Sequence, residues 1–167
     1  MKSKLGEAFI SPVFEYDFRN SLWGMTKGEV KLSEKLYPLS ESGTHIAYKD
    51  TVMCLEAIVG FHFVDDLLVE AGYAFCEASL DRELCIWEYE RVKLGLVQMY
   101  GEPLIDKDIS GPYENEGGAL EPDSKADSLM FIAEWLTSRS IIRLILVSEG
   151  PSLEFGVLHL RREDDSV

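Results

Sequence analysis

The chain has 167 residues, of which 46% are apolar, enough to bury the core of one domain without disulfides or metals. Its 16 basic and 30 acidic side chains give a formal net charge of −14 at pH 7. A chain this acidic repels nucleic-acid phosphates and anionic lipids, so we expect no nucleic-acid partner and no membrane insertion. The charge suits basic partners or cations, or serves solubility alone.

The first ten residues contain Lys2 and Lys4 but no apolar run, so we expect no signal peptide. No apolar stretch approaches the roughly 20 residues that span a bilayer. Cys54, Cys76 and Cys85 form no Cys-x-x-Cys motif, and three cysteines cannot all pair within one chain. A reducing, cytoplasmic compartment is therefore expected.

The first elements are a strand and a helix. Residues 13–18 alternate weakly between apolar and polar, which predicts a short strand. Thr26 and Glu29 have the spacing of a capping box, in which each side chain bonds the other residue's backbone N–H. This pair predicts a helix over residues 27–36, which Pro38 ends.

A strand over residues 45–49 and a β-hairpin follow. Residues 52–64 and 67–75 alternate between apolar and polar positions, and the pair Asp65-Asp66 between them favours a turn. The alternation places on one face Met53, Leu55, Ala57, Val59, Phe61, Phe63, Leu67, Val69, Ala71, Tyr73 and Phe75.

The hairpin register follows from keeping both apolar sets on the same face. A two-residue turn would place the two sets on opposite faces, so it is excluded. A three-residue loop over residues 64–66 pairs Phe63 with Leu67 and places Cys54 opposite Cys76. Registers shifted by two residues would also match the faces. We expect two free thiols, with a redox role as the alternative.

The second half repeats the order of helix and strands. Residues 81–100 predict a helix, which Asp81 caps and which has one apolar stripe. Residues 102–127 are expected to form an acidic, mobile loop. Three further strands are expected over residues 129–136, 141–147 and 153–160.

These elements predict an α+β fold in a single domain, residues 1–167, with antiparallel sheet and two helices on one face. The halves, residues 13–77 and 81–161, suggest a duplicated unit of one helix and three strands. The apolar faces predict a common core of Trp23, Val30, Phe61, Phe63, Tyr73, Val92, Leu96 and Trp135.

The acidic loop contains a candidate calcium site. Asp106, Asp108 and Ser110 place oxygen ligands at alternate positions before Gly111, as calcium loops begin. The closing glutamate is absent from the twelfth position, which is Gly117. The other interpretation is a solvated acidic loop without a bound ion.

The remaining candidates are weaker. His45, His62 and His159 form no metal-binding motif, although His45 and His62 could approach each other on neighbouring strands. Glu134 lies within a strand, on the face opposite Trp135, where it is expected to meet water. No nucleophile motif or phosphate loop is present, so we assign no catalytic residue and no cofactor.

Trp23 precedes the first helix and is expected to pack beneath its first turn. Four short motifs stand out along the chain: Phe18 with Leu22-Trp23-Gly24-Met25-Thr26-x-x-Glu29-Val30, Gly60-Phe61-His62-Phe63 with Asp65-Asp66-x-Leu68, Tyr100-Gly101-Glu102-Pro103, and Trp135-x-Thr137. In these motifs the chain resembles a group of uncharacterised bacterial domains that open with an aromatic residue, then Trp-Gly and a capped helix.

More distantly, the chain is similar to the helix-then-meander units of beta-lactamase-inhibitor-like domains and of the small outer-membrane-assembly lipoprotein domain. The resemblance implies a binding or scaffolding module and supplies no catalytic residues. Because we expect no signal peptide and no lipidated cysteine here, the chain is expected to differ from the exported examples in location.

Together these observations lead to two hypotheses. The first is a non-enzymatic domain that binds a protein partner through the sheet face turned away from the helices. The second is an enzyme or small-molecule-binding protein with a pocket between sheet and helices. A flat face with exposed aromatic residues would favour the first, and a concave pocket holding perturbed carboxyl groups would favour the second.

Overall fold

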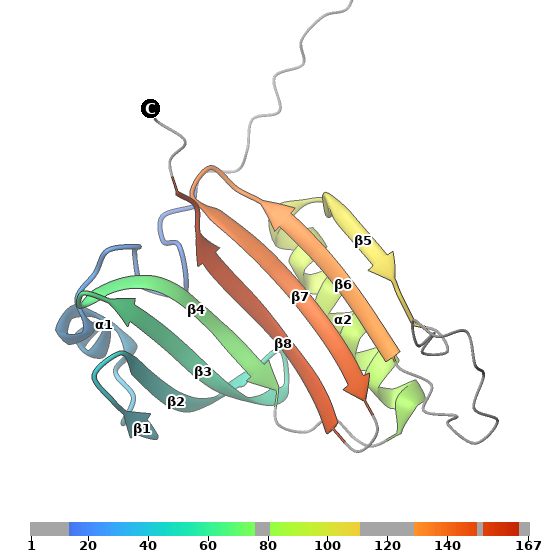
Figure 1. Cartoon of the computed structure of the whole chain (residues 1–167), viewed down its shortest axis with the longest axis horizontal. Coiled ribbons are helices and arrows are strands. Elements are labelled where there is room, and N and C mark those ends of the chain that lie inside the picture. The colour runs from blue at the N-terminus through green and yellow to red at the C-terminus, as the bar shows by residue number, and fades with distance from the viewer. Residues whose placement is uncertain (1–13, 76–80, 111–128, 150–151, 164–167) are drawn as a thin grey trace, which may run out of the picture.

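A computed structural model describes residues 14–75, 81–110, 129–149 and 152–163. These residues form one antiparallel sheet of eight strands and two helices, so the α+β class is confirmed, with the sheet as the larger part (Figure 1). In chain order the elements are α1 (Lys27–Glu34), β1 (Ser40–Glu41), β2 (His45–Val52), β3 (Leu55–Val64), β4 (Leu67–Phe75), α2 (Arg82–Tyr100), β5 (Ile105–Asp108), β6 (Leu129–Leu136), β7 (Ser140–Glu149) and β8 (Ser152–Arg161).

The strands lie in the order β1-β2-β3-β4-β8-β7-β6-β5. Each half of the chain therefore contributes one helix and four strands, where the sequence predicted three strands. The last strands of the two halves, β4 and β8, pair at the centre and join both meanders into a single sheet.

The predicted capping box of α1 is confirmed. The backbone N–H of Thr26 donates to Glu29 Oε2 at 2.8 Å, and the N–H of Glu29 donates to Thr26 Oγ1 at 3.3 Å. The helix ends at Glu34, because Lys35 adopts the left-handed conformation. It is thus two residues shorter than predicted.

The strand expected at residues 13–18 is wrong over its described part, because residues 17–21 turn back on themselves. Phe18 and Ser21 exchange backbone hydrogen bonds, and Asp17 accepts the N–H of Trp23 at 2.7 Å. The Trp23 indole is buried and donates to Ser140 Oγ at 2.9 Å, which links this segment to the start of β7. Trp23 also packs in one cluster with Val30 of α1, so its burial against that helix agrees with the prediction.

The β3–β4 hairpin exists, but its predicted turn is wrong. Asp65 and Asp66 form a two-residue turn with φ of 51° and 61°, and Val64 pairs with the first residue after it, Leu67. A β-bulge at Val69 adds one residue to β4, so that His62 pairs with Glu70. The bulge restores the matching of the apolar faces that the turn alone would have broken.

The bulge changes which side chains of β4 reach the core. Leu68 is fully buried, whereas Leu67, which the alternation placed on the same face as Phe61 and Phe63, is 42% exposed. Cys54 lies in the turn between β2 and β3, with a φ of 63°, and its thiol is exposed and free. Cys54 therefore lies in no paired strand, so the predicted strand position of Cys54, opposite Cys76, is wrong. Cys76 itself lies outside the described residues.

Helix α2 agrees with the prediction. The Asp81 carboxylate accepts the N–H groups of Glu83 and Leu84. Helix α2 ends before Gly101, whose φ is 85°. The loop expected at residues 102–127 is partly wrong, because residues 105–108 form β5 and pair with β6; residues 111–128 lie outside the described part of the chain. A short polar strand of this kind has too little alternation to be recognised in the sequence.

Both helices lie on the same face of the sheet. Val30 of α1 packs with Val59 and Phe61, and Val92 of α2 packs with Ala57, which alternates with them on β3. The predicted core residues are all buried except Tyr73, which is partly exposed. They form two clusters, one under each helix, where the sequence predicted one, and Tyr73 packs against both.

Phe61→Ala should lower the free energy of unfolding by roughly 3–5 kcal/mol, because it leaves a cavity among closely packed rings. Phe61 is 1% exposed, and its ring centroid lies 5.4 Å from that of Phe18. Urea unfolding of the two proteins measures the difference. Val64→Ala, at a position 50% exposed on the same strand, is the control and should cost less than about 1 kcal/mol. Similar losses in the two variants would contradict the assignment of faces.

Candidate functional site: the open face of the sheet

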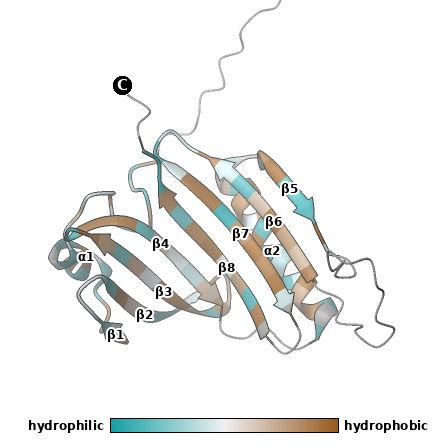
Figure 2. Cartoon of the chain, in the orientation of Figure 1, coloured by the Kyte–Doolittle hydropathy of each residue, from teal (hydrophilic) through white to brown (hydrophobic). Residues whose placement is uncertain are grey.

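The face of the sheet turned away from both helices is covered by no described element (Figure 1). On β6, β7 and β8 most positions of this face are apolar. Figure 2 shows brown stretches along these strands, interrupted by teal positions. Large aliphatic side chains stand side by side there and are partly exposed: Met130, Ile132, Ile141, Ile145, Val147, Leu158 and Leu160. We call these seven residues the aliphatic shelf.

Beside the aliphatic shelf the same face is hollowed over β2, β3, β4 and β8. The cavity has a volume of about 530 Å³. Its floor consists of neighbouring small residues, because Gly60 pairs with Ala47 on one side and with Gly72 on the other, and Ala74 pairs with Gly156. Leu158 and Ile145 form the wall towards the aliphatic shelf.

Glycine occupies the positions of the floor for different physical reasons. A Cβ on Gly72 would lie 2.5 Å from the carbonyl oxygen of Val157, and one on Gly156 would lie 2.4 Å from that of Tyr73. Both therefore allow the close approach of β4 and β8. A Cβ on Gly60 would meet nothing within 4 Å, and the backbone there needs no left-handed conformation.

Two imidazoles and two carboxylates border the cavity. His45 and His62 are directly paired on β2 and β3, and their ring centroids lie 4.2 Å apart, so the predicted approach is confirmed. Glu70 pairs with Leu160 on β8, and Glu154 lies six positions before Leu160 on that strand. At about 3.4 Å per residue, the two carboxylates stand roughly 20 Å apart, at opposite ends of the cavity.

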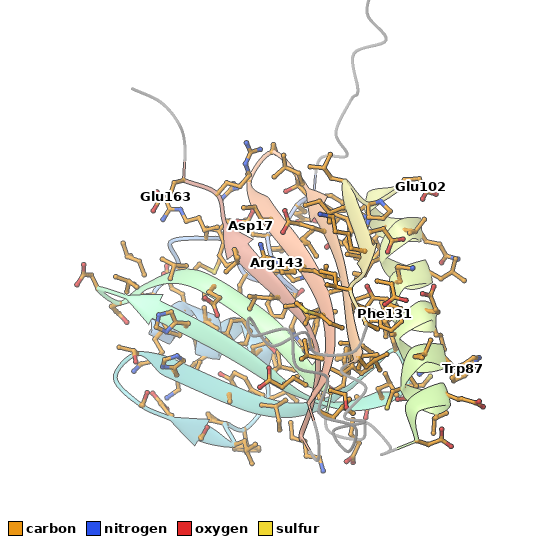
Figure 3. All side chains as sticks on the ribbon, turned by 45° about the vertical axis from the view of Figure 1, so that its right-hand side comes forward. Asp17, Trp87, Glu102, Phe131, Arg143 and Glu163 are labelled. Atoms are coloured by element: carbon orange, nitrogen blue, oxygen red, sulfur yellow. The ribbon has the colours of Figure 1, made fainter. Side chains whose placement is uncertain are left out.

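Glu134 lies on this face as predicted, but it does not simply meet water. Arg143 donates to Glu134 Oε2 from Nε at 2.9 Å and from a terminal nitrogen at 2.7 Å, across neighbouring strands. Figure 3 shows Arg143 on β7 within the open face, whereas Trp87 projects from α2 away from the sheet. The ion pair leaves the aliphatic shelf without an uncompensated charge at this position.

The calcium candidates form part of the edge strand. Asp106 pairs with Lys93 of α2 at 3.2 Å, and Asp108 accepts the N–H of Ser110 at 2.9 Å. The Ser110 hydroxyl accepts the N–H of Met130 at 3.0 Å. Asp106 and Asp108 are in a paired strand instead of a loop that turns around an ion. Within the described ranges, no three His, Cys, Asp or Glu side chains converge to hold a metal.

Another cluster of ionisable groups lies on the helix side. Arg19 donates to Glu34 at 3.0 Å and to Asp50 at 2.8 Å, which joins α1 to β2. Burial raises the pKa of the Glu34 carboxyl despite the opposite effect of Arg19, whereas the hydrogen bond from Arg19 lowers the pKa of Asp50. With both carboxylates held by one guanidinium, the cluster is a structural link between elements.

His159 lies on β8 but faces the helices, apart from the other two histidines. It is 4% exposed, and its ring edge contacts Phe18 with centroids 4.9 Å apart. Burial lowers the pKa of His159 to about 4, and a hydrogen bond with the backbone of Asp17 opposes this shift only in part. His159 is thus a neutral core residue at pH 7.

Comparison with protein-family models, with curated proteins and with solved structures finds no match to this chain. No described helix has the length and apolar character needed to cross a bilayer.

The sequence hypothesis placed a binding surface on this face of the sheet, but it identified neither the aliphatic shelf nor the cavity, although two signals for them are present. Residues 141–147 are apolar at every position except Arg143, which is typical of a strand with two apolar faces. Gly72 and Gly156 follow Glu70 and Glu154 at the same spacing, which marks matched positions on the two central strands. The cavity itself required the strand order, which brings β4 beside β8.

Acidification should destabilise the protein through His159, because its ring protonates readily only after unfolding. Its pKa of about 4 in the folded chain compares with about 6.5 in an unfolded chain. The stability it contributes is therefore complete above pH 6.5 and is lost as the pH falls towards 4. Between about pH 7.5 and pH 5, His159 should account for a loss of about 2 kcal/mol in the free energy of unfolding.

Urea unfolding of the wild type and of His159→Phe at both pH values measures this loss. The variant should lose about 2 kcal/mol less than the wild type on acidification. Equal losses would show that His159 is accessible to protons in the folded chain.

Proposed function

We propose that this chain is a non-enzymatic protein-binding domain whose open sheet face is the binding surface. The observation that carries the proposal is the aliphatic shelf, an apolar surface with no described element over it. Neighbouring apolar residues exposed over several strands are typical of an interaction site in a folded domain. Their burial against a partner would be favourable by about 25 cal/mol for each Å² removed from water.

The size of the face suits a protein partner. Six strands, β2, β3, β4, β8, β7 and β6, each have eight residues or more. At a spacing of about 4.8 Å and a rise of about 3.3 Å per residue, they span roughly 650 Å² in plan. This area is close to the roughly 800 Å² that each partner contributes to a stable protein–protein interface.

The resemblance to helix-then-meander binding modules supports the same proposal. The arrangement of one helix and four strands in each half supports an origin by duplication, and so do the matched motifs Glu70-x-Gly72 and Glu154-x-Gly156. A reducing, cytoplasmic setting remains part of the proposal, because three cysteines without a pairing motif suit that compartment.

A small-molecule-binding protein or enzyme is the alternative, and the cavity favours it. Its volume of about 530 Å³ lies within the range of ligand pockets, about 300–1,000 Å³. The cavity opens on the face away from the helices, whereas the sequence hypothesis placed a pocket between sheet and helices. The two bordering carboxylates, Glu70 and Glu154, lie roughly 20 Å apart, too far to act together on one reacting atom.

Affinity capture from the native host with substituted baits tests the proposal. Ile145→Asp introduces a charge into the aliphatic shelf and should abolish capture of proteins that the wild type retains. Leu94→Asp, at a position of α2 that is 60% exposed, is the matched control and should retain them. Thermal melting of each bait establishes that it is folded.

Capture of the same proteins by all three baits, or of none by the wild type, would contradict the proposal. Ile132→Asp, on the neighbouring strand of the aliphatic shelf, serves as a second variant if Ile145→Asp does not fold.

A further inference from the structure

We infer that the cavity of the open face receives an extended, basic segment of the partner, with aliphatic side chains between two cationic residues six positions apart. This inference rests on the proposed function and specifies the chemistry of the partner. It follows from the floor of the cavity, from the charges at its ends and from the distance between them.

Gly60 shows that the cavity is not a requirement of the fold. A side chain at this position would meet no atom within 4 Å, and the backbone is not left-handed. Glycine in the interior of a strand weakens it, because glycine has the most conformational freedom to lose and no side chain to pack. A position that costs stability without a geometric need is typical of a site that another molecule approaches closely.

The approximate symmetry of the sheet supports this interpretation. Tyr73 pairs with Val157 at the centre of the β4–β8 pair, so the two halves match about this point. Gly60 pairs with Gly72, and Ile145 pairs with Gly156, so Gly60 and Ile145 occupy equivalent positions. The C-terminal half fills this position with a large aliphatic side chain, and the N-terminal half leaves it empty.

The charges at the two ends select a cationic ligand. Glu70 and Glu154 border the cavity, and neither forms an ion pair with another described residue. The lining between them is largely apolar, with Ile58, Ile145 and Leu158. The net charge of −14 adds a field that attracts a basic partner over a longer range.

The separation of the carboxylates sets the spacing in the ligand. A segment in the extended conformation advances about 3.3 Å per residue, so two residues six positions apart span roughly 20 Å. Side chains alternate between its faces, so the positions two and four residues after the first cation point the same way. The segment that fits therefore has the pattern Arg-x-Leu-x-Leu-x-Arg, with both leucines over the glycine floor.

The probe is a blocked synthetic peptide, Arg-Thr-Leu-Thr-Leu-Thr-Arg, compared with Glu-Thr-Leu-Thr-Leu-Thr-Glu. Titration into the ¹⁵N-labelled full chain at low salt, followed by NMR, gives Kd and locates the site. We expect the arginine peptide to bind at least tenfold more tightly than the glutamate peptide and to shift the amide signals of Gly60 and Gly72. Added salt should weaken it.

Substitutions test the two features separately. Gly60→Val should raise Kd at least tenfold without lowering the melting temperature, and Gly43→Val, outside the cavity and also free of close contacts, should leave Kd unchanged. Glu70→Gln and Glu154→Gln should each raise Kd several-fold, whereas Glu102→Gln, away from the cavity, should not. If Gly60→Val does not fold, Ala47→Leu fills the floor from the neighbouring strand.

Equal affinity for the two peptides, shifts confined to other surfaces, or unchanged binding by the folded cavity variants would overturn the inference. The proposed function stands or falls separately, on whether Ile145→Asp loses the captured host proteins. If a partner binds the aliphatic shelf but the arginine peptide does not bind the cavity, the inference of a basic segment is refuted. The proposed binding face then still stands.

Discussion

The pairing of β4 with β8 is the interaction on which the rest of the structure depends. It joins two meanders into one sheet, although its central residues, Tyr73 and Val157, lie in opposite halves of the chain. The strands approach closely because Gly72 and Gly156 have no Cβ, which would lie 2.5 Å and 2.4 Å from opposing carbonyl oxygens. Without this contact each helix would cover a separate four-stranded unit, and the open face would be divided in two.

The local features of the fold were predictable from the sequence, since neighbouring residues encode them. Thr26 and Asp81 begin the helices as predicted, and the six longest strands were predicted at their places in the chain, residues 141–147 from an apolar, β-branched run instead of from alternation. Features that depend on distant partners were not predictable. The edge strand at residues 105–108 is recognisable only through its pairing with β6, and the bulge at Val69 reconciles a two-residue turn with matched faces.

Much less of the candidate site could be predicted. The approach of His45 and His62 followed from neighbouring strands, but the cavity needs Gly60 and Gly156, which border one floor only when β4 lies between β3 and β8. The calcium pattern at Asp106 and Asp108 shows the opposite problem, because spacing alone did not reveal that these residues are in a strand. A sequence pattern describes the chemistry within one segment, whereas this cavity is lined by residues of five strands.

The two outer strands have a consequence for how this sheet meets other chains. An uncovered strand edge presents unpaired N–H and C=O groups and invites aggregation by the addition of further strands. Here β1 has only two residues, and β5 has four, of which Asp106, Lys107 and Asp108 are charged. Short, charged borders disfavour growth of the sheet sideways. A protein can therefore leave a broad apolar face uncovered and still resist edge-to-edge polymerisation.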